Sequence, residues 1–232
     1  WRAKALDLTY EAYLDGSSYI ALGAFYKKLD SYIYTQNFDF DFSNAPNNST
    51  IVPISNIGNM SRPANGQGGN IKGLELSMSL DAGKIHESLQ GFGFIGSQSW
   101  ADSGIEPDGP GKKTKLPGLS DRVRDLTVYY ENESFSARLS QRYRSEFRGE
   151  VVQLFATRGY TEVLADKQVD AQLSYNFVEG ALDGLTLLLQ VNNLTNSPYT
   201  TRLNTEQGGG SYFPEVYEEY GRQVLFGISY KL

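Results

Sequence analysis

The 232-residue sequence contains no cysteine and only one histidine. Without cysteine, the chain has neither a disulfide framework nor a thiolate metal site. The single histidine, His86, has no second histidine with which to share a metal ion. The segment around it also offers no partners for a hydrolase triad. The composition therefore predicts no metal site and no cofactor. We interpret the protein as something other than an enzyme, with a carboxylate pair working alone left open as the alternative.

Long apolar runs are missing as well. No stretch of about 18 apolar residues occurs, which excludes a transmembrane helix. It does not exclude a transmembrane β-barrel, whose strands alternate polar and apolar residues and therefore average out as polar. The net charge of -6 argues against nucleic acid as a partner, because phosphates demand a basic surface. The sequence is rich instead in tyrosine (16), phenylalanine (12) and glycine (24), which favours strands and turns over helices.

A period-two alternation of apolar and polar residues recurs along the chain. It is clearest at 6–14, 74–80, 135–140, 170–177, 185–192 and 223–232, and the segments 18–34, 90–102 and 119–131 are strand-like but less regular. Nowhere does a helical period persist. The pattern predicts an all-β protein with about nine antiparallel strands.

The connections between these segments alternate between short and long. Short turns are predicted at 15–18, 82–89, 131–133 and 178–184, and long polar loops at about 35–69, 103–118, 148–160 and 198–219. Tight turns at one rim and large loops at the other are the plan of outer-membrane barrels. Because an odd number of strands does not fit a closed bacterial barrel, we expect residues 1–232 to be the C-terminal part of a longer barrel domain.

Charged residues share one face of the predicted strands. Glu11, Glu75, Arg138, Arg142 and Asp170 all fall on the polar side of the alternation. An arginine facing lipid near the bilayer midplane would cost about 2–4 kcal/mol, so this side is predicted to border a wet lumen and the apolar side to face lipid. The alternative is a soluble lipocalin-like barrel with its apolar side inside, but such barrels rarely carry four long loops.

Five stretches carry a family resemblance: GNIKGLELSMSL (69–80), LPGLSDRVRDLTVYYENESFSARLSQRYRSEF (116–147), VDAQLSYNF (169–177), LQVNNLTNSPY (189–199) and YGRQVLFGISYKL (220–232). They resemble the TonB-dependent receptors, active importers of Gram-negative outer membranes. The resemblance implies a barrel of about 22 strands, a plug domain and a TonB box that this sequence does not contain, and uptake powered through TonB. The run from PGLSD to YRSEF looks most like the branch associated with oligosaccharide uptake. A ferric-siderophore receptor is the main alternative, and a passive porin without a plug is another.

The resemblance places ligand capture at the outer loops. Aromatic rings stack on sugar rings or planar siderophores, and arginines pair with carboxylates or phosphates. The candidate ligand-binding residues are Trp100, Arg144, Arg148, Tyr160, Arg202, Asn204, Tyr212, Phe213 and Tyr217. Tyrosine and tryptophan also form girdles at membrane interfaces, which is the alternative for the aromatic candidates. The implied partners are the ligand, outer-membrane lipid and the TonB complex. The resemblance also allows a surface lipoprotein as a further partner.

Three further motifs have simple structural interpretations. Residues 91–96 fit G-x-G-x-x-G, but no helical pattern follows, so we interpret the glycines as fitting a crowded strand. Asn193 and Asn196 are expected to cap hydrogen bonds between strand and loop. Asp39 and Asp41 share a strand face and could contribute to a divalent-cation site, although a solvated acidic edge is the simpler expectation.

Overall fold

The computed structural model describes residues 2–14, 16–46, 50–106, 111, 113–152, 158–204 and 212–231. The described strands are β1 (Ala3–Tyr13), β2 (Tyr19–Asp41), β3 (Ile57–Asp81), β4 (Phe92–Ile105), β5 (Arg122–Glu131), β6 (Phe135–Arg144), β7 (Phe147–Val152), β8 (Arg158–Val163), β9 (Asp166–Asn176), β10 (Leu185–Asn192), β11 (Tyr199–Asn204), β12 (Tyr212–Glu218) and β13 (Gln223–Tyr230). Short 3-10 turns stand at η1 (Ala82–Lys84), η2 (Glu87–Leu89) and η4 (Gly180–Leu182). No helix in this part of the chain is long and apolar enough to cross a membrane.

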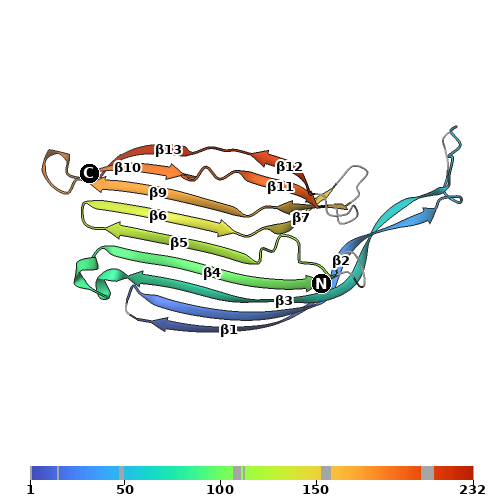
Figure 1. Ribbon diagram of the computed structural model, residues 1–232, viewed down its shortest axis with the longest axis horizontal. Helices are drawn as coiled ribbons and strands as arrows, with labels where there is room; N and C mark the ends of the chain where they lie inside the picture. The colour runs from blue at the N-terminus through green and yellow to red at the C-terminus, as the bar shows by residue number, and fades with distance from the viewer. Residues whose placement is uncertain are drawn as a thin grey trace.

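Nine of these strands form one antiparallel sheet in the order β1-β2-β3-β4-β5-β6-β9-β10-β13. They correspond to the nine segments with period-two alternation, so the predicted all-β antiparallel fold is confirmed. Neighbours in the sheet are neighbours along the chain, except where β7, β8, β11 and β12 leave it at one end (Figure 1). These four strands form a separate sheet in the order β12-β11-β8-β7.

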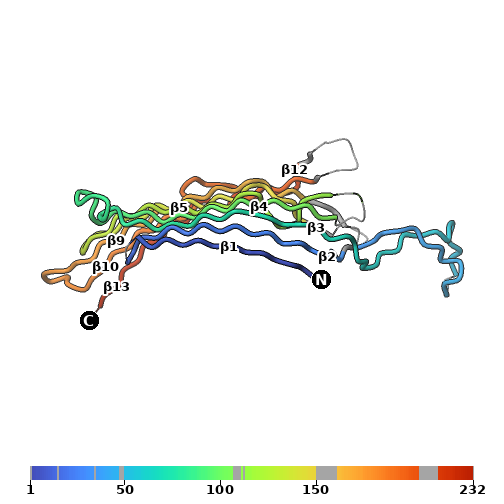
Figure 2. Tube along the Cα trace, turned by 90° about the horizontal axis from the view of Figure 1, so that it is seen from below, coloured from blue at the N-terminus to red at the C-terminus, as the bar shows by residue number. Residues whose placement is uncertain are grey.

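The large sheet is curved. Seen along its edge, β1 and β13 bend to the same side of the middle strands, so that the sheet forms a trough (Figure 2). In the described residues β1 and β13 each pair with a neighbour on one side only. Open, curved edges of this kind suit a segment of a barrel wall, because a complete barrel has no edge strands.

The two faces of the sheet differ in chemistry. Leu74 pairs with Ala24 and Trp100 and shares their face, whereas the adjacent Glu75 pairs with Gly23 and Ser99 on the other face. The apolar face is exposed: Leu8 retains 73% and Phe226 67% of its accessible surface.

A soluble barrel would bury its apolar face. Among the described residues, only Tyr32 and Ile105 are buried hydrophobics, so there is no packed core inside the trough. So large an apolar surface, continued over neighbouring strands, requires an apolar environment. The exposed apolar face therefore fits the lipid-facing wall of a membrane barrel rather than the packed interior of a soluble one.

The short connections are as predicted. They join β1 to β2, β3 to β4, β5 to β6 and β9 to β10, and all lie at the end of the sheet where the C-terminus lies (Figure 1). His86 is in one of them, where its Nδ1 accepts from the Ser88 N–H at 3.2 Å. The glycines of 91–96 fit close packing: a Cβ on Gly93 would lie 2.2 Å from the Tyr129 ring.

Asn193 confirms its predicted role as a cap. Its backbone has a φ of 53°, in the left-handed region that asparagine tolerates. Its side-chain oxygen accepts from Ser197 N at 2.8 Å, and its amide donates to Gly221 O at 3.2 Å. The turn after β10 is thereby joined to the start of β13. Asn196 also has a positive φ, 52°, without a capping side-chain bond among the described residues.

The long connections were predicted as loops, and that prediction is wrong for three of the four. Residues 35–69 are mostly the outer halves of β2 and β3, which continue beyond the sheet as a two-stranded ribbon (Figure 1). Residues 148–160 and 198–219 contribute β7, β8, β11 and β12 to the smaller sheet. Their Gly, Pro and Asn content weakens the strand signal, but pairing between hairpins supplies the hydrogen bonds that local propensity does not.

Candidate functional site

The long-connection end of the barrel wall carries most of the predicted ligand-binding residues. Three structures lie at that end: the ribbon of β2 and β3, the connection between β4 and β5, and the four-stranded sheet (Figure 1). The alternation that orients the wall strands continues into this end, so side chains point either to the lumen or outward.

The connection between β4 and β5 folds back on the end of β4. Ile105, which is fully buried, exchanges two backbone hydrogen bonds with Thr114, at 2.9 and 2.8 Å. Leu116 N donates to the buried Ser103 Oγ at 2.9 Å. These bonds satisfy backbone groups that a free loop would leave to water, so the described residues 113–121 form a compact cap.

Arg144 and Arg148 hold that cap. Arg144 is the last residue of β6 and lies on the polar face of the wall. It donates from Nε to Ser120 Oγ at 2.7 Å and from Nη2 to Gly118 O at 2.5 Å. Arg148 retains 9% of its accessible surface; its guanidinium donates to Thr114 Oγ1, and its carbonyl accepts from Gly118 N at 2.7 Å. Both candidates thus make structural contacts within the rim.

Arg202 on β11 is engaged in the same way. Its Nε donates to the Glu162 carboxylate at 2.7 Å, and its Nη2 lies 3.9 Å from Glu146. A β-bulge next to it, between Thr201 and Arg202, turns Glu215 of β12 toward two buried threonines. Thr201 donates to Glu215 at 3.1 Å, and Thr161 donates to the same oxygen.

Tyr217 is the more exposed of the two aromatic candidates whose side chains are described. It retains 63% of its accessible surface and donates its hydroxyl to Glu219 at 2.7 Å. Beside it, Tyr220 is 71% exposed and donates to Glu218. The hydrogen bond and the negative charge of the neighbouring carboxylate raise the pKa of each tyrosine. Both rings therefore present an aromatic face next to a carboxylate.

Trp100 lies elsewhere. It pairs with Leu74 and Arg122 on the lipid-facing side of the wall, close to the long-connection end, and is 42% exposed. Trp100 therefore has the position of an aromatic girdle residue at the membrane interface and does not face the lumen. For four other candidates the backbone stands in β8, β11 or β12, but their side chains lie outside the described part: Tyr160, Asn204, Tyr212 and Phe213.

A shallow cavity of about 210 Å³ opens on the polar face below the cap. Arg142 lies at its edge, where it donates to Gln168 at 2.9 Å and stands 3.6 Å from Asp170. Asp166, also in its lining, accepts from Ser197 at 2.9 Å. Two acids, Asp125 and Asp166, and two arginines, Arg142 and Arg144, line the cavity, so its wall offers hydrogen bonds to a polar ligand rather than a net charge.

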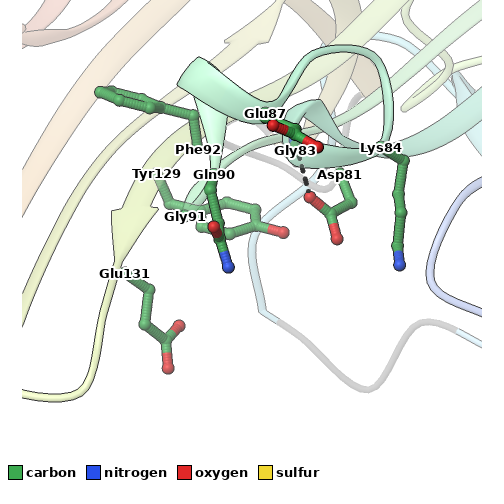
Figure 3. Close-up of a pocket in the computed structure, with 9 residues that line it drawn as sticks. All are labelled: Asp81, Gly83, Lys84, Glu87, Gln90, Gly91, Phe92, Tyr129 and Glu131. Atoms are coloured by element: carbon green, nitrogen blue, oxygen red, sulfur yellow. Dashed lines mark hydrogen bonds between the residues drawn. The ribbon is translucent and has the colours of Figure 1, made fainter.

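A larger cavity, of about 420 Å³, lies at the opposite, short-turn end (Figure 3). It lies between the turn that follows β3 and the ends of β4 and β5, with Asp81, Glu87 and Glu131 among its lining residues. Asp81 caps the turn by accepting from Gly83 N at 2.9 Å, the bond drawn in Figure 3. None of the predicted ligand-binding residues lines it.

The pair Asp39 and Asp41 lies on the ribbon. Asp41 accepts from Ser43 N at 2.9 Å and from Ser43 Oγ at 2.5 Å, and these bonds lower the pKa of its carboxyl. Within the residues that the structure describes, no three His, Cys, Asp or Glu side chains gather as a metal site would need.

The partners of the candidate arginines were missed by sequence reasoning. The sequence does not indicate these partners, because each lies in a different segment from its arginine. They are Ser120, Thr114, Glu162 and Glu146. A weak signal existed: Glu146, Arg148 and Glu162 alternate with apolar or small residues, as in strands that carry charges on one face.

Residues 1–194 match the family described as TonB dependent receptor-like, beta-barrel. The chain belongs to the TonB-dependent receptor family. Together with the exposed apolar wall, this places it in the outer membrane of a Gram-negative bacterium, as predicted. No curated protein has a matching sequence.

Several solved structures have a similar fold. The unliganded ferric citrate transporter FecA has a TM-score of 0.59 and 17% identity, covering 97% of this chain and 30% of that one. The siderophore receptor PiuA from Acinetobacter baumannii has a TM-score of 0.59 and 16% identity, covering 98% and 28%. The ferripyoverdine receptor of Pseudomonas aeruginosa, bound to ferripyoverdine, has a TM-score of 0.54 and 15% identity, covering 97% and 26%. This chain therefore spans less than a third of the length of these receptors.

Proposed function

We propose that residues 1–232 form the C-terminal part of the barrel domain of a TonB-dependent importer. The remainder of the longer protein would supply the other strands, a plug and the segment that contacts TonB. The fraction of the solved receptors that this chain covers, from 26% to 30% in the three above, supports this division. The wall strands would contribute a closed lumen in which all backbone groups are paired, and the rim structures would contribute ligand contacts.

For the ligand we propose a ferric siderophore or a related iron chelate. The observation that carries this proposal is the similarity of nearly the whole chain, both sheets included, to receptors named for ferric citrate, a siderophore and ferripyoverdine. The contacts at the rim refine it. Because Arg144, Arg148 and Arg202 are engaged in internal bonds, recognition would depend on exposed aromatic rings such as Tyr217 and Tyr220.

An oligosaccharide is the second candidate. Its support is the pairing of each exposed ring with a carboxylate, Tyr217 with Glu219 and Tyr220 with Glu218. Such a pair suits a sugar, because the apolar face of the sugar stacks on the tyrosine ring while its hydroxyls donate to the glutamate carboxylate.

The test uses the full-length receptor in detergent and a panel of ferric siderophores and neutral oligosaccharides, with binding measured by calorimetry. A siderophore that binds in the micromolar range or tighter, and loses at least tenfold in affinity with Tyr217→Ala, is the expected result. Tyr230→Ala on the lipid-facing side of β13 is the matched control, and its affinity should be unchanged. Binding of oligosaccharides alone would overturn the proposed ligand in favour of the second candidate.

Energy coupling separates an importer from a passive porin. Cells lacking TonB should take up the ligand at the background rate while still binding it at the surface. Uptake that continues undiminished without TonB would support the porin alternative instead.

A further inference from the structure

The lipid-facing side of the wall ends in cations at the long-connection end. At this level the strands β1, β2, β3 and β9 each carry an exposed lysine on the lipid-facing side, and β5 carries two arginines. These residues are Lys4, Lys28, Lys72, Lys167, Arg122 and Arg124. Two acids share this face at about the same level: Asp102, 3.5 Å from Lys72, and Asp30, two residues beyond Lys28 on β2. The chain as a whole carries a charge of -6, so this is a local segregation of positive charge.

The level of these cations matches one boundary of the hydrocarbon. At the opposite end of the same face, Phe92, Tyr130 and Phe135 form an aromatic cluster, with the first two ring centroids 4.7 Å apart. Along β4, Phe92 and Asp102, the partner of Lys72, are separated by about 33 Å at 3.3 Å per residue. With a strand tilt of about 40°, this is about 25 Å along the membrane normal, the usual height of the apolar band. The cations therefore lie at outer-leaflet headgroups.

Two arrangements in this belt place like charges side by side. Lys4 and Lys28 are directly paired across β1 and β2, which is unfavourable for like charges unless an anion lies between them. Arg122 and Arg124 follow each other on one side of β5, about 7 Å apart at two residues' rise. Within the described residues neither arginine makes an ion pair.

Arg124 is held in place without an acid. Its Nη2 donates to Gln141 Oε1 at 2.7 Å, and its guanidinium lies 5.5 Å from the centre of the Tyr143 ring. Its Nε is buried and has no hydrogen-bond partner in the described part of the chain. Gln98, its neighbour on β4, is itself bound to backbone oxygens of Ser99 and Val123. The guanidinium is thus oriented while its charge remains available.

We propose that Arg122, Arg124 and Lys167 bind the phosphate of an outer-leaflet lipid against the outside of the barrel. Guanidinium groups bind phosphate through paired N–H donors, and a nearby ammonium adds charge. Lys167 pairs with Tyr143, which pairs with Arg124, so the lysine lies two strands, about 10 Å, from Arg124. A lipid is the occupant because the acyl chains would lie on the apolar wall directly below, on Leu139, Leu126 and Val169.

The experiment compares two lipids on the full-length receptor. Native mass spectrometry in detergent would measure retention of lipid A and of the same lipid after its phosphates are removed. The wild-type receptor is expected to retain the phosphorylated form at least tenfold better. The double variant R122Q/R124Q is expected to lose most of this preference, while R138Q, on the opposite face of the wall, keeps it. Inorganic phosphate at the same concentration should not displace the lipid; displacement would mean that phosphate alone is recognised.

Folding of the variants is checked by the heat-modifiable shift of the barrel in electrophoresis. Should R122Q/R124Q fail to fold, R122K/R124K retains charge without the paired donors and should keep an intermediate preference that falls with added salt. Equal retention of both lipids by the wild type would overturn the proposal. So would an unchanged preference in a folded R122Q/R124Q receptor.

Discussion

The Nε–H of Arg144 donates to Ser120 Oγ at 2.7 Å and joins the end of β6 to the cap after β4. The same guanidinium lies 3.7 Å from the centre of the Phe147 ring, so it is fixed on a second side. Four residues further along, Arg148 makes a parallel contact with Thr114. The rim is therefore a set of hairpins bound to one another, and its arginines determine the position of the cap.

Replacing Arg148 by methionine should release the cap. The change removes a hydrogen bond from a charged donor and leaves Thr114 without that partner, which costs about 1.5–3 kcal/mol. Amide hydrogen exchange in 113–121 should then accelerate by about tenfold or more. Arg138→Met, on the open polar wall, is the matched control and should leave these amides unaffected. Unchanged exchange in the Arg148 variant would show that Ile105 and Ser103 hold the cap without it.

Arg202 and Glu162 should be energetically coupled. Their side chains are 31% and 19% exposed, so water screens their 2.7 Å contact only in part. A double-mutant cycle with Arg202→Met and Glu162→Gln is expected to give a coupling of about 1 kcal/mol in urea unfolding. The more exposed pair Lys72 and Asp102 offers a comparison within the same protein, and its coupling should be smaller. Equal coupling in the two cycles would contradict partial burial as the cause.

Tyr217 should titrate above its ordinary pKa. The hydrogen bond to Glu219 and its charge favour the protonated phenol, so the pKa is raised from 10.0. The contact with Glu219 therefore stabilises the fold below pH 10.0 and is lost as the pH rises through the higher folded value. Tyrosinate absorbance at 295 nm, taken as the difference between wild type and Tyr217→Phe, should have its midpoint above pH 10.0. Glu219→Gln should lower that midpoint, and a midpoint that does not move would remove Glu219 as the cause.

The wall of this barrel is predictable from sequence because its cause is local. Alternation such as Leu74-Glu75-Leu76-Ser77 fixes which side chains meet lipid, and the register follows from it. The ribbon and the smaller sheet were not predictable, since segments such as Arg62-Pro63-Ala64-Asn65 have little strand propensity and are paired only in the hairpin.

The contacts of the candidate site were harder still to predict, because they too join segments that are distant in the sequence. Arg144 and Arg148 stand out in the sequence as free cations, but Ser120 and Thr114 lie 24 and 34 residues away and become their partners only through the fold. Tyr217 is exposed at the rim, and its role in ligand binding remains a prediction.

Trp100 should be quenched by lipid rather than by ligand. Its place beside Leu74 on the outer side of the wall exposes the indole to acyl chains near the headgroups. In vesicles of brominated lipid, the fluorescence difference between wild type and Trp100→Phe should fall, most strongly with bromine near the headgroup. Addition of the ligand should leave that difference unchanged. A response to ligand alone would return Trp100 to the binding site.

The orientation of the wall can be tested by labelling, because the chain has no cysteine to interfere. Ile54, beyond the end of the ribbon strands, is fully exposed, and Lys84 lies in the short turn at the opposite end. With Ile54→Cys in the full-length receptor, a membrane-impermeant maleimide should label intact cells. With Lys84→Cys, labelling should require a permeabilised outer membrane. Both variants place a small side chain at a surface position, so neither should alter folding by more than about 0.5 kcal/mol. The reverse labelling would place the ribbon in the periplasm, and the rim could then not be the place where external ligand is captured.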